Sequence, residues 1–463
     1  MKVKVINRSS SQYIRETKND IHKLPRNNDP SMHPFSLQRE HQRALNAVKL
    51  DRVFAKPFVG SLDGHSDSVQ KLIKHPFKLS TLFSAACNGE IKIWNLTTFH
   101  CIKTIKAHDS IVRNVCIPQH GRYFFSVDDS QTIKQWDLSF LNEIVFEMDN
   151  EEQVQWLQTD LTPMQTIISK NPLYFMDNHH QKPLLITCGQ SVELWEENRT
   201  QPLRSWQWGN DSVNYIRFNP IINDVCCAAA TDRSLTLYDI RKSRPIEKVI
   251  MAMRSNAICW NPLEASIFTV ANEDYQLHTF DMRKLNFPLQ VHKDHISAVI
   301  SLDYSSTGRE FVSAGYDKTI RIFTSLSRRS RETYHTKRMQ RLTDVVWSLD
   351  SKFIISSSDE MDIRLWKANA SEKLGFKAPR EYVNFEYQDK LKKKFAKHPD
   401  IHRISKFRHV PKHIKQGQKE LQSIEEAQKR KETNRLLHSD PKKLAKMAKS
   451  VPEVKKQIIR LES

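Results

Sequence analysis

An aromatic residue recurs along this chain at a nearly constant spacing. The intervals between successive members are 42, 59, 43, 42, 43 and 43 residues, and each aromatic closes a short run of alternating apolar residues. A period of about 40–45 residues indicates a chain built from copies of one supersecondary unit. The members of the series are Trp94, Trp136, Trp195, Tyr238, Phe280, Phe323 and Trp366.

One copy of the unit, residues 294–325, shows what is repeated. Three alternating runs are separated by a polar turn at residues 305–308 and a tight turn at residues 316–318, which predicts a small antiparallel sheet. Such a sheet cannot bury both of its faces alone, so it needs neighbouring copies on either side. The sequence therefore predicts an all-β fold, a seven-bladed WD40 β-propeller.

Each unit carries polar residues at fixed places. The acidic turn residue six positions before the aromatic is Asp232, Asp274 or Asp317, and it has drifted to Asn88, Ser130, Gly189 and Glu360 elsewhere. A Gly-His-like pair opens three units, at Gly64-His65, Ala107-His108 and Asp294-His295. His295, Ser313 and Asp317 are predicted to form a hydrogen-bonded network that stiffens the blade. A catalytic role is rejected, because the trio recurs as packing and no nucleophile-activating context accompanies it.

Composition excludes several classes of protein. The mean hydropathy is −0.59 and no apolar run approaches the length needed to cross a bilayer, so no membrane association is expected. The seven cysteines form no paired metal motif and are predicted to be reduced core residues. No metal, cofactor, small-molecule substrate or enzymatic activity is expected.

The net charge of +19 is distributed unevenly. Residues 1–51 hold 10 basic and 5 acidic residues, residues 52–366 hold 36 of each, and residues 367–463 hold 26 and 12. A neutral ring with basic appendages predicts contact with a polyanion, RNA or DNA; a merely solvated tail is the alternative. We expect three regions: an extended arm at 1–51, the propeller at 52–368, and a basic helical extension at 369–463.

The appendages have their own predicted elements. A short helix is expected at Gln38–Leu50, and Arg52–Leu62 is expected to close the ring as the outer strand of the last blade, because an open ring leaves unpaired edges. Helices are expected near Arg380–Lys397, Pro411–Leu437 and Lys442–Ala448, with too few apolar residues for a core of their own.

Two repeats end alike, in Tyr238-Asp239-Ile240-Arg241 and Phe280-Asp281-Met282-Arg283. This layout resembles the box by which WD-repeat substrate receptors dock on the adaptor of cullin–RING ubiquitin ligases. The predicted docking residues are Asp239, Arg241, Asp281 and Arg283; ordinary strand-end decoration is the alternative.

Basic clusters mark two further candidate surfaces. The segment between the last two repeats is predicted to bind RNA or protein through Arg328, Arg329, Arg331, Tyr334, Lys337, Arg338 and Arg341. In the extension, a salt-dependent phosphate surface is predicted at Lys392, Lys393, Lys394, Arg403, Lys406 and Arg408. An acidic insertion between Trp136 and Trp195 is either a docking loop or a solvated one.

Motifs across the whole chain resemble the Sof-like WD-repeat proteins of the small-subunit processome. They include MKVKVINRS at the start, FAKPF at 54–58, AICWNPLEA at 257–265, YHTKRMQ at 334–340 and VPK at 410–412. The resemblance implies a scaffold in the U3 small nucleolar ribonucleoprotein (U3 snoRNP), required for early processing of the 18S ribosomal RNA precursor. Other processome proteins, precursor RNA or small nucleolar RNA are the implied partners, and the location is the nucleolus within the nucleus. A cullin-ligase adaptor is implied as the alternative partner.

Overall fold

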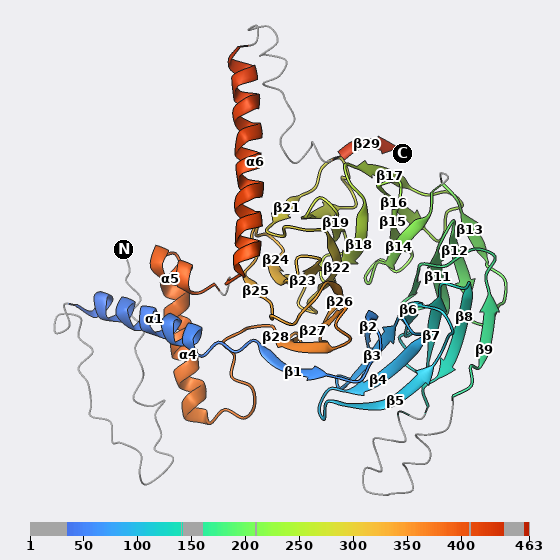
Figure 1. The fold of residues 1–463 in the computed structure, drawn as a ribbon, viewed down its shortest axis with the longest axis horizontal. Coiled ribbons are helices and arrows are strands. Elements are labelled where there is room, and N and C mark those ends of the chain that lie inside the picture. Colours follow the sequence, from blue (N-terminus) through green and yellow to red (C-terminus); the bar gives the residue numbers. More distant parts are fainter. Residues whose placement is uncertain are drawn as a thin grey trace, which may run out of the picture. The chain divides into compact units, whose positions relative to one another are not determined.

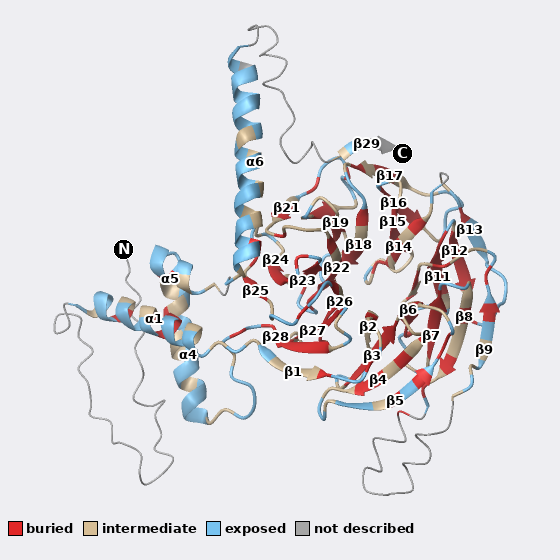
Figure 2. Cartoon of the chain, viewed as in Figure 1, coloured by how far each residue is buried: buried red, intermediate tan, exposed pale blue. Residues whose placement is uncertain are grey.

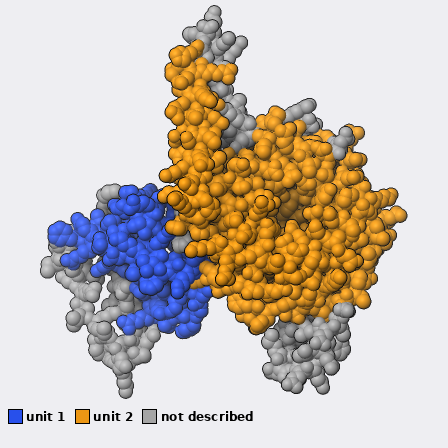
Figure 3. Space-filling view, in the orientation of Figure 1, with its two compact units in different colours: residues 1–57, 369–407 blue, residues 58–368, 408–463 orange. Residues whose placement is uncertain are grey.

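The computed structural model describes residues 35–139, 141, 161–208, 211–406, 409–438 and 458–462. They fall into two compact units: residues 58–368 with 408–463, called here the ring unit, and residues 1–57 with 369–407, called the helical unit (Figure 3). The acidic insertion and the helix expected at Lys442–Ala448 lie outside the described residues.

The ring unit is the predicted seven-bladed propeller, and each blade is an antiparallel sheet (Figure 1). Blade 1 contains β2 (Val69–Lys74), β3 (Thr81–Ala86), β4 (Glu90–Asn95) and β5 (His100–Lys106). Blade 2 contains β6 (Val112–Cys116), β7 (Tyr123–Asp128), β8 (Thr132–Asp137) and β9 (Gln165–Ile168). Blade 3 contains β10 (Phe175–Asn178), β11 (Leu184–Cys188), β12 (Val192–Glu196) and β13 (Arg204–Trp206).

Blade 4 contains β14 (Val213–Phe218), β15 (Val225–Ala230), β16 (Ser234–Asp239) and β17 (Glu247–Met251), with β29 (Ile458–Glu462) as a fifth strand. Blade 5 contains β18 (Ser255–Trp260), β19 (Ile267–Asn272), β20 (Gln276–Asp281) and β21 (Gln290–Lys293). Blade 6 contains β22 (Val299–Tyr304), β23 (Glu310–Gly315), β24 (Ile320–Thr324) and β25 (Glu332–Tyr334). Blade 7 contains β26 (Leu342–Trp347), β27 (Phe353–Ser358), β28 (Ile363–Lys367) and β1 (Phe58–Leu62).

The ring closes through β1, which pairs antiparallel with β28. Leu62 is fully buried in this strand, and Phe58 meets the Trp366 ring edge to face at 5.6 Å. The expected closing segment was too long, because Arg52 and Val53 belong to helix α1 (Ser36–Val53) rather than to the strand. The pairing joins the first strand of the ring unit to the last repeat, so β28 has no unpaired edge where the ring closes.

Burial explains why the strands alternate less than surface strands would. All six residues are buried in β3 and in β15, where Val225-Cys226-Cys227-Ala228-Ala229-Ala230 packs between neighbouring strands and blades (Figure 2). The turn between β3 and β4 is also tightly packed. Gly89 has φ +87°, and a Cβ there would lie 1.9 Å from the His108 carbonyl oxygen of the next blade, so only glycine fits.

The ring unit also contains α6 (Lys412–Leu437), which is largely exposed along its length (Figure 2). Its first half packs on the ring: Ile414 is 1% exposed, and Gln418 Nε2 donates a 3.0 Å hydrogen bond to the Asp294 carbonyl oxygen. Further along, Lys293 Nζ lies 3.4 Å from Glu425 Oε1. The extension therefore places this helix with the propeller rather than with the other helices.

The helical unit contains α1, α4 (Pro379–Lys394) and α5 (Pro399–Ile404). Contrary to the expectation of too few apolar residues, it has a small core of Ala44, Val48, Leu391 and Ile401. The arm is therefore not simply extended, because its helix α1 supplies half of this core. Lys394 Nζ reaches Glu40 Oε2 at 2.5 Å, and Arg52 Nη1 donates to the Lys406 carbonyl oxygen at 3.0 Å.

Candidate functional site

The His295–Ser313–Asp317 trio forms the expected hydrogen-bond network inside blade 6. His295 Nδ1 lies 2.9 Å from Asp317 Oδ2, and His295 Nε2 lies 2.7 Å from Ser313 Oγ. All three are buried. Burial opposes ionisation of Asp317, but His295 and Arg321 hold its pKa at about 2. The serine sits between strands rather than at a cavity, so the arrangement rigidifies the blade.

The same network recurs with local changes. In blade 2, Trp136 Nε1 donates to Ser126 Oγ at 2.9 Å, and His108 Nε2 lies 2.7 Å from the same oxygen. The acidic partner is Asp128, 3.2 Å from His108 Nδ1, although Ser130 stands at the usual acidic position. Asp128 is the last residue of β7, two residues before Ser130, so a fixed spacing from the aromatic residue does not find it.

The two Asp-x-Arg endings adopt the same turn in adjacent blades. Asp239 Oδ1 accepts the backbone N–H of Arg241 at 2.9 Å, and Asp281 Oδ1 accepts that of Arg283 at 3.0 Å. Both turns follow the third strand of their blade, β16 and β20. Equivalent positions in neighbouring blades lie on one rim of a propeller, and both arginine side chains are exposed.

The two arginines differ in their electrostatic surroundings. Arg241 Nη2 lies 3.1 Å from Asp224 Oδ2, and Asp224 also accepts from Lys182 Nζ at 2.7 Å. The hydrogen bond from Lys182, aided by Arg241, lowers the pKa of Asp224. In blade 5 the corresponding residue is Ser266, whose carbonyl accepts from Met282 as that of Asp224 does from Ile240. Ser266 cannot balance the charge of Arg283.

The basic segment between the last two repeats is divided by a buried strand, β25. Arg328 and Arg329 are exposed in the β24–β25 loop. The β25–β26 loop exposes three more basic side chains: Lys337, Arg338 and Arg341. This trio is called here the β25–β26 basic loop, and the Arg341 guanidinium lies 5.5 Å from the centroid of the Tyr316 ring.

Two predicted members of this surface are structural instead. Tyr334 is 1% exposed, stacks on Trp366 at 5.7 Å, and donates a hydrogen bond to Glu332, so it cannot stack on a nucleic-acid base. Arg331 lies 2.9 Å from Glu310 and 2.8 Å from Glu332, and these contacts hold it between strands. Tyr334 is the last residue of the outer strand β25 and packs against Trp366 of the last blade. Its burial could not be predicted, because the surrounding sequence has the composition of a loop.

Helix α6 starts beside the β25–β26 basic loop. His335 Nε2 lies 3.1 Å from the His409 carbonyl oxygen, three residues before the helix begins. The first turns of α6 expose Lys412, Lys415 and Lys419, while Ile414 faces the ring. The loop and helix together form a basic surface that the linear sequence separates by some 70 residues.

The lysine cluster of the extension is partly used inside the helical unit. Lys392 Nζ lies 2.5 Å from Asp51 and 2.8 Å from Asp389, and Lys394 pairs with Glu40. Lys393 and Arg403 are exposed, whereas the Lys406 carbonyl accepts the bond from Arg52. Arg408 lies outside the described residues. The exposed part of this predicted phosphate surface is therefore smaller than the sequence suggested.

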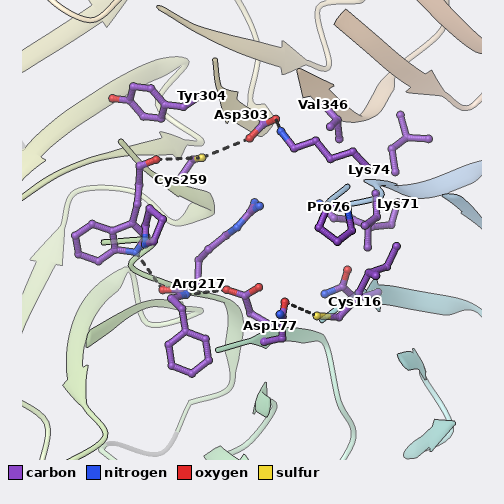
Figure 4. A pocket seen from close by; sticks show the side chains of 18 of the residues that line it. Lys71, Lys74, Pro76, Cys116, Asp177, Arg217, Cys259, Asp303, Tyr304 and Val346 are labelled. Carbon is purple, nitrogen blue, oxygen red and sulfur yellow. Dashed lines mark hydrogen bonds and ion pairs between the residues drawn. The ribbon is translucent and has the colours of Figure 1, made fainter. Parts of the chain in front are cut away.

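The first strands of the blades line a central cavity of about 370 Å³ (Figure 4). Lys71 pairs with Asp344 at 3.0 Å and Lys74 with Asp303 at 3.2 Å, while Arg217 and Asp177 face the same space. Each acid also accepts a backbone N–H of the next blade: Asp177 from Phe218, Asp303 from Trp347, and Asp344 from Leu72. These balanced charges fasten neighbouring blades together.

The two cysteines that line this cavity lack the lowered pKa of a nucleophilic thiol. Burial raises the pKa of the Cys259 thiol to about 11, and burial likewise raises that of Cys116. Five of the seven cysteines are buried as predicted, whereas Cys87 is half-buried and Cys101 is exposed, so the prediction was wrong for Cys101. Across the described residues, no three His, Cys, Asp or Glu side chains are grouped to hold a metal ion. No described helix is long and apolar enough to cross a membrane.

Comparisons with known proteins extend over nearly the whole chain. A family model described as "Sof1-like domain" matches residues 368–458, and one described as "WD domain, G-beta repeat" matches residues 99–137, 286–324 and 331–367. The chain is 50% identical to "DDB1- and CUL4-associated factor 13" of Homo sapiens, covering 95% of this chain and 96% of the relative. The Xenopus laevis protein of that name is 51% identical with the same coverage.

A yeast relative and a solved structure complete the comparison. "Protein SOF1" of Saccharomyces cerevisiae is 38% identical, covering 99% of this chain and 94% of the relative. The crystal structure of the WD40 beta propeller domain of Doa1 aligns with a TM-score of 0.55 at 16% identity, over 67% of this chain and 96% of that one. The last likeness shows the propeller fold alone. A scaffold or adaptor fits this fold and these relatives.

Proposed function

Because the chain belongs to the Sof1-like family of WD-repeat proteins, we propose that it is a non-enzymatic scaffold of the small-subunit processome. In this role it joins the U3 snoRNP in the nucleolus and supports early processing of the 18S ribosomal RNA precursor. The observation that carries the proposal is the Sof1-like match at residues 368–458, on a chain related to yeast "Protein SOF1" over its whole length.

The charge distribution supports RNA as a direct partner. Several exposed cations lie close together on the β25–β26 basic loop and on the first turns of α6, while residues 52–366 as a whole hold equal numbers of basic and acidic residues. Lysine and arginine side chains on a neutral platform bind phosphates through counterion release, so this contact is sequence-blind and salt-dependent. Because Tyr334 is buried, stacking of nucleic-acid bases on its ring does not contribute to binding at this loop.

A charge-reversal experiment tests this assignment. The triple variant Lys337→Glu, Arg338→Glu, Arg341→Glu should leave the ring folded and lose co-sedimentation with pre-ribosomal particles. The matched control reverses three exposed lysines outside this loop: Lys106→Glu, Lys170→Glu and Lys352→Glu. Equal recovery of both triple variants with particles contradicts the proposed RNA surface.

A second function is favoured by the paired turns of blades 4 and 5. Relatives are named as factors associated with DDB1 and CUL4, and the Asp239–Arg241 and Asp281–Arg283 turns present two fork-shaped donors from adjacent blades. We propose that this rim docks on a cullin-ligase adaptor, making the chain a substrate receptor. Arg283, with no acidic neighbour at the Ser266 position, is the stronger anchor.

Adaptor capture distinguishes this second function. The double variant Arg241→Ala, Arg283→Ala should abolish capture of purified DDB1, and Arg283→Ala alone should weaken it more than Arg241→Ala alone. Arg233→Ala is the control, since Arg233 lies at the opposite end of β16 from Arg241. Unchanged capture by the double variant rejects the docking role while leaving the scaffold function untouched.

A further inference from the structure

The outer edge of blade 4 is occupied by the far end of the chain. Strand β29 pairs antiparallel with β17, and this is the single blade with a fifth strand in the part of the chain that the structure describes (Figure 1). The Cα register places Met251 opposite Ile458 and Ile250 opposite Arg460, with an irregularity between the two pairs. A complete four-stranded blade does not need this strand to close the ring.

The outer strand of blade 4, β17, is covered by the added strand β29. With β29 paired to it, none of its five residues is exposed, and Val249 and Met251 are 1% and 0% exposed. Among outer strands without a fifth strand, two of the four residues of β9 and two of the three residues of β13 are exposed in blades 2 and 3, whereas β21 and β25 expose none in blades 5 and 6. β17 contains no proline and carries three consecutive apolar residues, Val249, Ile250 and Met251, and an edge strand of this kind can pair with an extended chain that reaches it.

One residue of the added strand acts as an anchor. Ile458 packs, partly buried, against the core cluster that contains Val249 and Met251. Its neighbour Ile459 is 61% exposed, because successive residues of a strand point to opposite faces. Strand addition takes its affinity from main-chain hydrogen bonds and its selectivity from such alternate side chains.

We propose that the outer edge of β17 is a peptide-binding site for an extended, proline-free segment with a branched apolar anchor, and that the chain's own C-terminal strand is its resident ligand. Bound in cis, the segment shields Val249, Ile250 and Met251 from pairing with the same edge of a second copy. The site is separate from the basic surface near α6, and it does not depend on the proposed function.

A peptide in trans tests the proposal. A fluorescent peptide of residues 456–463 should bind saturably to a chain ending at residue 457, and about tenfold or more tighter than to the full chain, whose site is occupied. The Ile458→Lys peptide should lose this binding, while the Ile459→Lys peptide should keep it. No binding to a cooperatively melting truncated chain, or equal binding by the two substituted peptides, overturns the proposal.

Hydrogen exchange on the full chain gives a second readout that needs no truncation. The Ile458→Lys variant should speed amide exchange in Glu247–Met251 and raise the oligomeric fraction in light scattering, and Ile459→Lys should do neither. Unchanged exchange in both variants contradicts occupation of the edge. A full-chain dimer that Ile458→Lys converts to monomer contradicts binding in cis, because the segment would then be exchanged between copies.

Discussion

Trp136 Nε1 donates a 2.9 Å hydrogen bond to Ser126 Oγ, and the same oxygen lies 2.7 Å from His108 Nε2. One hydroxyl thus satisfies two buried nitrogens, one on strand β8 and one in the connection between β5 and β6. In blade 6 the equivalent hydroxyl, Ser313 Oγ, lies 2.7 Å from His295 Nε2 and donates a 3.5 Å bond to the Arg321 carbonyl oxygen, but it meets no indole N–H because Phe323 replaces the tryptophan. The two serines occupy equivalent positions, but only Ser126 accepts from an indole N–H.

This difference predicts unequal stability losses. Ser126→Ala leaves both the Trp136 and the His108 nitrogens without a partner, a cost of about 2–4 kcal/mol, whereas Ser313→Ala strands one nitrogen at about 1–2 kcal/mol. Thermal melting of the two variants at pH 7.5 measures the difference. Equal melting temperatures would show that the indole bond adds nothing to the network.

The buried histidines predict a loss of stability in mild acid. Burial, aided by Lys92, lowers the pKa of His65 to about 4, and burial lowers that of His292 to about 4 despite its bond to the Ser327 carbonyl. The unfolded chain, whose histidines titrate near pH 6.5, binds more protons than the folded chain between pH 6.5 and 4. Stability therefore falls as the pH drops through that window, by about 2 kcal/mol for each histidine at pH 5.

The His65→Gln variant isolates this contribution. It should be less stable than the wild-type chain at pH 7.5, since the bond of His65 to Ser84 is disturbed. Between pH 7.5 and pH 5 it should lose about 2 kcal/mol less than the wild-type chain. Parallel losses in the two proteins would mean that His65 is not kept neutral by its burial.

Ring closure predicts a sharp boundary for N-terminal deletions. A chain starting at Phe58 keeps β1, but a chain starting at Asp63 removes the partner of β28 and the fully buried Leu62. Losing that side chain alone costs about 2–5 kcal/mol, so the shorter chain should melt about 10 °C lower. Both deletions remove α1 equally, so differential scanning calorimetry of the pair reports the strand. Coincident melts would contradict closure by β1.

The propeller could be predicted because a period of 40–45 residues stays visible when individual positions change. In blade 2, for example, Asp128 is the acidic partner of His108, and Ser130 stands at the usual acidic position. The sequence pattern also placed the long helices within a few residues, at α4 and α6. The core of the helical unit could not be predicted. Ala44 and Val48 pack against Leu391 and Ile401, which lie some 350 residues away in the sequence, and so few apolar residues leave no periodic pattern in any one segment.

The candidate surfaces were recovered in part for similar reasons. A run of basic residues in a sequence shows where cations are, but it does not show their ion-pair partners. Lys392 and Lys394 were therefore predicted to bind phosphates, although they pair with Asp51 and Glu40. The cavity charges escaped notice because Lys71, Arg217 and Asp344 sit on first strands of different blades, and only closure of the ring brings them together. Strand β29 is too short for its periodicity to stand out.

Replacing the cells' own protein with variants of this chain tests the proposed scaffold function. Cells depleted of their own copy should accumulate unprocessed small-subunit RNA precursor, measured by hybridisation of total RNA. The wild-type chain and the Lys106→Glu, Lys170→Glu, Lys352→Glu control should restore mature 18S RNA, and the Lys337→Glu, Arg338→Glu, Arg341→Glu variant should not. Normal 18S processing in the depleted cells would contradict the scaffold function itself.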